Sequence, residues 1–276
     1  MDGHQPAGST GHGPWSVDTG MRHTGLRVLE LEPGGSQSFG TQEREVIVVP
    51  LSGSCSVRCG AEEFTLAGRP GVFEGVSDFA YVPRRSEAVL SSPGGGRFAL
   101  ASGTARRDLP FRRGPADAVP VETRGAGSCR RQVNNLASAD GFTCDRLIVV
   151  EVVTPDGNWS SYPPHKHDEH TATESELEEI YYFEIGRGGF GQHRLGGSPP
   201  GPAGESAEVR TGDVVLVPDG WHGPSAALPG YPMYYLNVMA GPHDERAWRI
   251  TDDPAHAWIR DTWNSTPATP STEGAA

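Results

Sequence analysis

The chain has 276 residues, of which 36% are hydrophobic, and its formal net charge is −12 with the histidines neutral. It carries no stripe of Lys and Arg with interleaved aromatic residues, which argues against nucleic acid as a partner. No segment approaches the roughly 18 consecutive apolar residues that cross a bilayer, and the N-terminus shows no signal-peptide pattern. We therefore expect a cytoplasmic protein that does not associate with a membrane.

Both ends of the chain are rich in small polar residues, Gly and Pro, a composition typical of poorly ordered segments. We expect disordered tails at residues 1–14 and 263–276. Between them, short apolar or alternating runs bounded by Gly, Pro, Asp or Ser recur, as in "EREVIVVPLSG" and "EVRTGDVVLVPDG". Repeated strand and turn signals of this kind predict an all-β sandwich or barrel.

Two stretches in this region resemble each other in the order of their features. "GRPGVFEGVSDFAYVPRRSE" and "VRTGDVVLVPDGWHGP" each contain a basic residue, a glycine, an apolar strand and Val-Pro. An internal repeat predicts two β-barrels of one architecture. We expect the first barrel at residues 15–110, a connector at residues 111–140 and the second barrel at residues 141–262.

The stretch "SSYPPHKHDEH" places two histidines one residue apart in the second half of the chain. Residues i and i+2 of a strand face the same side, so His165 and His167 face one way and Lys166 faces the other. The double proline restricts the backbone just before them. The two histidines are therefore placed to share a metal ion.

A third ligand is expected from "ELEEIYYFEI", which offers two neighbouring glutamates. Glu179 shares its face with Leu177, Tyr181 and Phe183, whereas Glu178 lies on the opposite face. The more apolar face should line the barrel interior, where a carboxylate is costly unless it is paired or bound to a metal. We therefore prefer Glu179 to Glu178 as the ligand.

A fourth candidate ligand is His222, because the turn before it should return the chain to the barrel mouth. Three imidazoles and one carboxylate suit Zn²⁺, Mn²⁺ or Fe²⁺, and ligand type alone does not choose among them. The first half has no His-x-His, so we expect no metal there. We assign the first barrel to packing and assembly, and a homo-oligomer is left open.

The proposed ligands resemble the signature of the cupins, whose first motif runs glycine, His-x-His, glutamate and glycine. The second motif runs glycine, Pro-x-Gly and histidine. Two departures are present: a longer gap between His167 and Glu179, and one residue rather than two before His222. The resemblance implies an all-β bicupin, with two jelly-roll barrels related by an internal repeat and the metal in the second. The matching positions are Gly157, His165, His167, Glu179, Gly186, Gly212, Pro218, Gly220 and His222.

Longer stretches resemble the 5-deoxy-glucuronate isomerase (IolB) family, bicupins related to 5-keto-4-deoxyuronate isomerase. The likeness runs through "LELEPGGSQSF", "RGAGSCRRQVNNL", "LEEIYYFEI" and "DDPAHAWI" and covers nearly all residues between the tails. It implies a metal-dependent aldose–ketose isomerase of myo-inositol breakdown that converts a sugar acid, 5-deoxy-D-glucuronate, into 5-dehydro-2-deoxy-D-gluconate. In this reaction a proton moves from C2 to the aldehyde carbon, and a metal can stabilise the enediolate.

The isomerisation also needs a base that carries the proton, and the sequence leaves four candidates open. They are His193, Tyr181, Lys166 and Glu178. Each must reach the carbon-bound proton before its pKa matters, and each has an alternative role as a packed or solvated residue.

Candidates for binding the substrate follow from its chemistry. Its carboxylate calls for a cationic group, which Arg131, Arg194 or Lys166 can supply. Tyr235 and Asn237 lie two residues apart on one face of a predicted strand. They are candidates for binding sugar hydroxyls or, equally, for polar groups of the core.

Three other functions fit the same ligand set: 5-keto-4-deoxyuronate isomerase, an Fe²⁺ cupin dioxygenase, and a non-catalytic cupin that binds a sugar acid. The polar stretch "HKHDEH" at the predicted barrel mouth favours a sugar acid over an apolar substrate. We therefore expect the isomerase.

Overall fold

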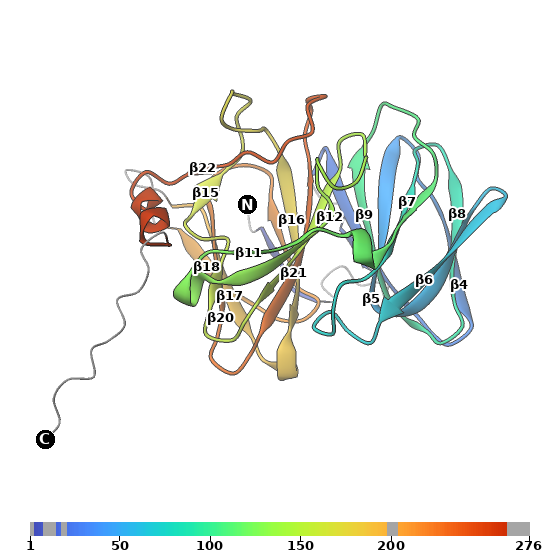
Figure 1. Cartoon of the computed structure of the whole chain (residues 1–276), viewed down its shortest axis with the longest axis horizontal. Coiled ribbons are helices and arrows are strands. Elements are labelled where there is room, and N and C mark those ends of the chain that lie inside the picture. The colour runs from blue at the N-terminus through green and yellow to red at the C-terminus, as the bar shows by residue number, and fades with distance from the viewer. Residues whose placement is uncertain (1–2, 8–14, 18–20, 198–203, 264–276) are drawn as a thin grey trace, which may run out of the picture.

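The computed structural model describes residues 3–7, 15–17, 21–197 and 204–263. Figure 1 shows two β-barrels side by side, with most of the first half of the chain in one barrel and the second half in the other. No helix in the described residues is long and apolar enough to span a membrane. Within these residue ranges the structure has four short 3-10 helices: η1 (Ala116–Ala118), η2 (Gly127–Cys129), η3 (Gly186–Gly188) and η4 (Ala257–Trp263).

The first barrel consists of two sheets that share the long strand β5. One sheet has the order β10-β7-β5-β9-β3-β2, and β6, β8 and β4 continue from the second half of β5. The strands are β2 (Trp15–Val17), β3 (Thr24–Leu31), β4 (Gly35–Gly40), β5 (Arg44–Cys59), β6 (Glu62–Arg69), β7 (Phe79–Val82), β8 (Glu87–Ser92), β9 (Gly96–Thr104) and β10 (Arg112–Gly114).

The second barrel closes between a sheet of order β1-β19-β16-β21-β13-β12-β11 and one of order β18-β17-β20-β15-β22, with β14 paired to β20. Its first sheet contains β1 (His4–Gln5), β11 (Val121–Arg124), β12 (Arg131–Ala137), β13 (Ile148–Thr154), β16 (Glu178–Ile185), β19 (Val214–Val217) and β21 (Met233–Ala240). Its second contains β14 (Trp159–Ser160), β15 (His165–Lys166), β17 (Gly191–Leu195), β18 (Glu205–Val209), β20 (His222–Ala227) and β22 (Thr251–Asp252).

The two barrels repeat one arrangement of strands. The order β7-β5-β9-β3 in the first barrel corresponds to β19-β16-β21-β13 in the second. Every residue of β16 and β21 is buried, because one face of each strand lines the barrel interior and the other packs on the first barrel. Tyr181 and Phe183 belong to the interior core, whereas Ile180 and Tyr182 pack with Ile47 of β5 between the barrels.

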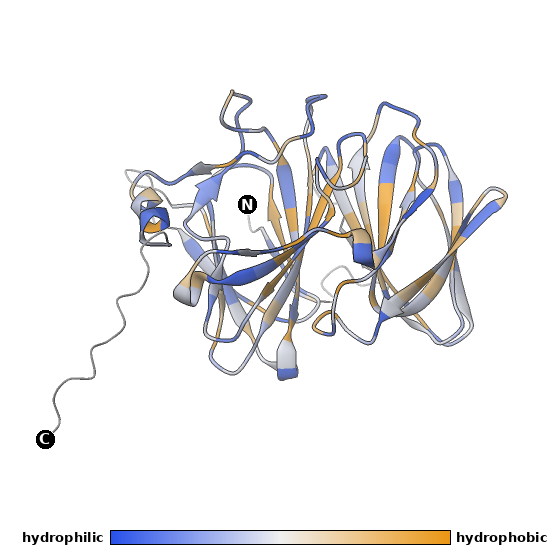
Figure 2. Cartoon of the chain, in the orientation of Figure 1, coloured by the Kyte–Doolittle hydropathy of each residue, from blue (hydrophilic) through white to orange (hydrophobic). Residues whose placement is uncertain are grey.

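Hydropathy follows this arrangement. Figure 2 shows hydrophobic residues concentrated on the strands and hydrophilic residues on many of the loops. Strands with both faces covered read as continuous apolar runs rather than alternating ones. The prediction of an all-β protein with two barrels is therefore confirmed.

Three segments differ from the predicted boundaries. Residues 3–7, predicted as part of a disordered tail, include β1, which pairs with β19 so that His4 lies opposite Val215. The predicted connector supplies β11 and β12 to the first sheet of the second barrel. Trp263, placed in the C-terminal tail, ends η4. The rest of that tail and, in the predicted N-terminal tail, residues 1–2 and 8–14 lie outside the described residues.

Candidate metal centre and substrate pocket

Three buried histidines converge inside the second barrel. His165 on β15 lies directly opposite His222, the first residue of β20, and His167 follows β15. One ligand nitrogen of each histidine lies within 4.8 Å of the others. The one-residue departure before His222 therefore does not keep that residue away from the pair.

The backbone holds all three imidazoles in one tautomer. The Nδ1 atoms of His165, His167 and His222 lie 3.1, 2.9 and 3.0 Å from the carbonyl oxygens of Pro163, Leu177 and Gly220. A carbonyl oxygen only accepts, so each Nδ1 carries the proton. In neutral imidazoles each Nε2 lone pair is then free to bind a metal, which is the usual arrangement of metal-binding histidines.

Glu179 completes the cluster from β16. Its Oε2 lies 3.0 Å from His167 Nε2 and 3.1 Å from His222 Nε2. Burial opposes its ionisation, but the His167 and His222 imidazoles, when they are protonated and positively charged, outweigh burial and hold the pKa of Glu179 below its usual range. Its Oε1 and His222 Nε2 are buried without hydrogen-bond partners in the described structure. Such buried atoms need a partner, and this donor set fits a divalent cation.

The long segment between His167 and Glu179 forms a loop that is held by hydrogen bonds within it. Leu177 donates its N–H to the His167 carbonyl at 2.9 Å, so the loop leaves and returns at the same point. Inside the loop, Glu174 accepts from the backbone N–H groups of Asp168 and Glu169 at 2.9 and 3.0 Å. Glu179 therefore still reaches His167 despite the longer gap between the two residues.

Lys166 anchors this loop instead of facing the histidines. Its ammonium contacts the carboxylates of Asp168, Glu169 and Glu174 at 2.5, 2.8 and 2.9 Å. Burial opposes the charge, but the three hydrogen bonds outweigh it and raise the pKa of Lys166. Asp168 also accepts from the Gly220 N–H, which ties the loop to the turn before His222. Lys166 is fully engaged away from the cluster.

Glu178 lies on the opposite face of β16, as strand alternation predicted. Its carboxylate accepts from the N–H groups of Arg22, His23 and Thr24 at 3.0, 2.6 and 3.2 Å. These residues enter β3 of the first barrel, so Glu178 contacts the other barrel rather than the three histidines. The structure does not bring it together with the candidate site.

Two other candidate bases lie close to the cluster. The Tyr181 ring lies 4.6 Å from the His193 ring and 6.1 Å from the His222 ring, measured between centroids. His193 is fully buried, and burial together with the neighbouring His222 lowers the pKa of His193 to about 3. Its Nδ1 contacts Ser225 Oγ at 2.8 Å, and its Nε2 has no partner among the described residues.

A chain of hydroxyls leads from Tyr181 to a pocket beside His165. Ser161 Oγ lies 3.3 Å from the Tyr181 hydroxyl and 2.9 Å from the Tyr235 hydroxyl. Ser161, Tyr235 and Asn237 all line this pocket together with His165. Burial raises the pKa of both tyrosines, so both are neutral at physiological pH.

The same pocket gathers three arginines from distant parts of the chain. Arg124 comes from β11, Arg131 from β12 and Arg260 from η4. Arg124 pairs with Glu122 at 2.7 Å, and Arg260 pairs with Asp252. Arg131 has no carboxylate partner in the described part of the chain, and burial lowers its pKa. An unpaired, buried guanidinium beside a pocket is suited to an anionic group of a ligand.

Arg194, the other arginine expected to bind substrate, lies elsewhere. It donates to the backbone carbonyls of Gly197 and Gly223 and does not line the pocket. The residue patterns did not single out Ser161, Arg124 or Arg260. Ser161 stands within "SSYPPHKHDEH", while the two arginines reach the pocket only through strand pairing and the C-terminal segment.

The sequence profile of the KduI/IolB family matches residues 7–259. The chain belongs to the KduI/IolB family. It is 39% identical over 247 residues to a 5-deoxy-glucuronate isomerase of Geobacillus kaustophilus, covering 88% of each chain. It is 35% identical over 252 residues to one of Bacillus subtilis strain 168, covering 90% of this chain and 92% of the relative.

Solved structures agree with this assignment to the KduI/IolB family. An IolB-like protein from Salmonella typhimurium LT2 superposes with a TM-score of 0.87 at 34% identity, covering 94% of this chain and 99% of that one. Oxalate decarboxylase from Bacillus subtilis shares the fold alone, with a TM-score of 0.57, 13% identity and coverage of 83% and 70%. The predicted bicupin fold and family are both confirmed.

Proposed function

We propose that this member of the KduI/IolB family is a metal-dependent isomerase that converts 5-deoxy-D-glucuronate into 5-dehydro-2-deoxy-D-gluconate. The observation that carries the proposal is the buried cluster of three imidazoles and one carboxylate, which opens through His165 onto a pocket lined by arginines and hydroxyls. Family membership and relatives named 5-deoxy-glucuronate isomerase support the reaction.

His165, His167, Glu179 and His222 would hold one divalent ion, with Zn²⁺, Mn²⁺ and Fe²⁺ the ions suited to this set. A bound ion would supply Lewis acidity that stabilises negative charge developing on substrate oxygens. The protein contributes the fixed tautomers of the histidines and a dry, rigid barrel around them. All four residues are at most 5% exposed, so water has little access to the cluster.

The residues of the pocket would bind the two ends of the substrate. Arg131, buried and without a carboxylate partner among the described residues, would bind the substrate carboxylate, and Arg124 and Arg260 would add positive charge around it. Tyr235 and Asn237 line the same pocket and would bind hydroxyls. Asn237 Nδ2 is buried without a partner among the described residues, which supports this role for Asn237. These contacts would hold the aldehyde end toward His165.

Tyr181 is our choice for the proton carrier. Its hydroxyl is joined through Ser161 to Tyr235 at the pocket, whereas Lys166 and Glu178 are engaged elsewhere. Tyr181 is neutral at the start, so it would first give its hydroxyl proton to the aldehyde oxygen. The phenolate would then take the proton from C2 and deliver it to C1, and Tyr181 would regain a proton from the C2 hydroxyl, so atoms balance. His193 packs against the Tyr181 ring as the second candidate.

The test is turnover of 5-deoxy-D-glucuronate by the purified, metal-replete protein, followed by NMR in D₂O. We expect a ketose product that carries deuterium at C1, because the carried proton exchanges with solvent. 5-keto-4-deoxyuronate serves as the comparison substrate and should turn over more slowly. No turnover of 5-deoxy-D-glucuronate by protein with a full metal complement would refute the proposal.

A further inference from the structure

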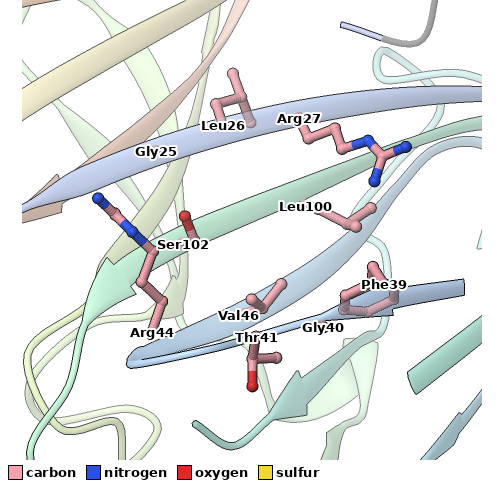
Figure 3. A pocket seen from close by; sticks show the side chains of 10 residues that line it. All are labelled: Gly25, Leu26, Arg27, Phe39, Gly40, Thr41, Arg44, Val46, Leu100 and Ser102. Atoms are coloured by element: carbon pink, nitrogen blue, oxygen red, sulfur yellow. The ribbon is translucent and has the colours of Figure 1, made fainter. Parts of the chain in front are cut away.

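The first barrel contains a cavity of its own, far from the candidate metal centre in sequence. Its volume is about 160 Å³, and it lies between strands β3, β5 and β9 and the end of β4. Figure 3 shows Arg44 reaching toward Gly25 and Ser102 at one end and Arg27 at the other. The apolar residues Val46, Leu100 and Phe39 also line it.

The internal repeat explains why this space is open. Pairing registers align Gly25 and Ser102 of the first barrel with Ile148 and Met239 of the second. Ile148 and Met239 are buried and fill the interior of the second barrel. A glycine and a serine at the same positions leave that volume empty in the first barrel. The cavity is therefore a product of specific residue differences between two equivalent sites.

The same alignment shows that charged and apolar side chains differ between equivalent positions of the two barrels. Val46 stands at the position of the ligand Glu179, and Arg27 stands at the position of Val150. The first barrel thus has an apolar valine where the second has a glutamate, and an arginine where the second has a valine. Compared with the second barrel, this site lacks the carboxylate and carries a cationic side chain instead.

The two arginines of the cavity have no acidic partners in the described structure. The Arg27 guanidinium makes no hydrogen bond or ion pair with the described residues, and the Arg44 guanidinium donates only to the His23 carbonyl, at 3.3 Å. A Cβ built on Gly25 would lie 2.7 Å from Ser102 Oγ and 3.3 Å from Arg44 Nη1, so these two groups meet above the glycine. The Glu87 carboxylate is nearby, beside Gly40, but pairs with neither arginine.

We propose that this cavity binds a small organic acid, with its carboxylate against Arg44 and Ser102 and its carbon chain over Leu100. An arginine beside a hydroxyl is suited to a carboxylate, and the apolar residues are suited to a short carbon chain. The size agrees, because a cavity of about 150 Å³ holds a molecule as large as benzene. Arg27 at the far end favours a second carboxylate, as in malonate or succinate.

The test is calorimetric titration of the full chain with malonate and succinate at low ionic strength. We expect saturable binding of one molecule, at least tenfold weaker in Arg44→Gln and in Ser102→Met, which restores the methionine of the second barrel. Arg58→Gln, which changes an exposed arginine of β5, should leave binding unchanged. Circular dichroism establishes that each variant is folded.

A second arm separates this cavity from the candidate substrate pocket. Arg131→Gln should leave malonate binding unchanged, and a loss of binding in that variant would overturn the proposal. Absence of saturable binding, or wild-type binding by both Arg44→Gln and Ser102→Met, would overturn it as well. Inorganic phosphate tests the ligand class: binding as tight as that of malonate would contradict an organic acid. None of these results depends on isomerase activity.

Discussion

Glu45 and Glu178 hold equivalent positions in the two barrels, and each accepts three backbone N–H groups from the other barrel. Glu45 on β5 accepts from Asp145, Arg146 and Leu147, each at 2.7 Å, just before β13 begins. Glu178 on β16 accepts from residues 22–24, which lead into β3. The two glutamates therefore join the barrels reciprocally, and each satisfies buried N–H groups that would otherwise lack acceptors.

We predict that Glu45→Gln and Glu178→Gln each destabilise the fold by about 1–3 kcal/mol, because an amide offers one acceptor oxygen and turns an NH₂ group toward buried N–H donors. Urea unfolding measures the change in the free energy of unfolding. Glu63→Gln, an exposed change on β6, is the control. Metal content should stay at the wild-type level in Glu178→Gln, and loss of metal there would contradict the separation of Glu178 from Glu179.

Removing a histidine of the cluster should remove the metal. We predict that His167→Ala weakens metal affinity by more than about 100-fold, because even a lost supporting contact costs about 10- to 100-fold. Elemental analysis after dialysis measures the metal content. His170→Ala is the matched control, since the His170 ring stacks on His243 at 3.7 Å, away from the cluster. Equal metal content in the two variants would show that His167 is not a ligand.

A buried ion pair joins the barrels at a second place. Arg69 on β6 pairs with Glu151 on β13, and Glu151 also accepts from Asn134 and Tyr234, each at 2.9 Å. Arg69→Met leaves a buried carboxylate without its cation, which should cost about 3–5 kcal/mol. Replacing both partners, as in Arg69→Met with Glu151→Leu, should cost less than Arg69→Met alone.

The control for the ion pair is Arg210→Met, since Arg210 and Glu208 form an exposed pair whose loss should cost about 0–1 kcal/mol. Urea unfolding gives the free energy of unfolding of the wild type, the two single variants and the double variant for comparison. Similar losses in Arg69→Met and Arg210→Met would mean that burial adds nothing to the Arg69–Glu151 pair.

The proton carrier can be tested with adjacent tyrosines. Tyr181→Phe should lower kcat by about 100- to 10,000-fold, the range for loss of a general acid or base, with metal content unchanged. Tyr182→Phe is the control, because its hydroxyl donates to Glu184 at 3.2 Å on the face toward the first barrel. Wild-type kcat in Tyr181→Phe, with loss of activity in His193→Gln, would assign the role to His193.

The all-β fold and the grouping of His165, His167 and Glu179 could be predicted from the sequence. Strand periodicity separates Glu179 from Glu178 because neighbouring side chains of a strand face opposite sides. The turn before His222 made that residue a further candidate, and the cupin-like spacing agreed with it. These inferences depend on local geometry and on a recurring motif, both of which can be read along the chain.

Other features depend on contacts between segments far apart in the sequence. Arg124 and Arg260 reach the candidate pocket through β11 and η4, and no local pattern indicates that these elements meet. Residues 3–7 have the composition of a tail, yet β1 is held by pairing with β19. Tertiary pairing overrides composition here because an unpaired strand edge can satisfy the backbone of a short polar segment.

The sequence by itself determined the strand-rich fold, the two-barrel repeat and the identity of the candidate metal ligands, because periodicity and spacing encode them locally. Only the tertiary structure decided that Glu178 and Lys166 are engaged away from the cluster, since their partners come from the other barrel and from a folded loop. It also decided that Gly25 and Ser102 leave a cavity in the first barrel, because an empty volume depends on the packing of side chains from several strands.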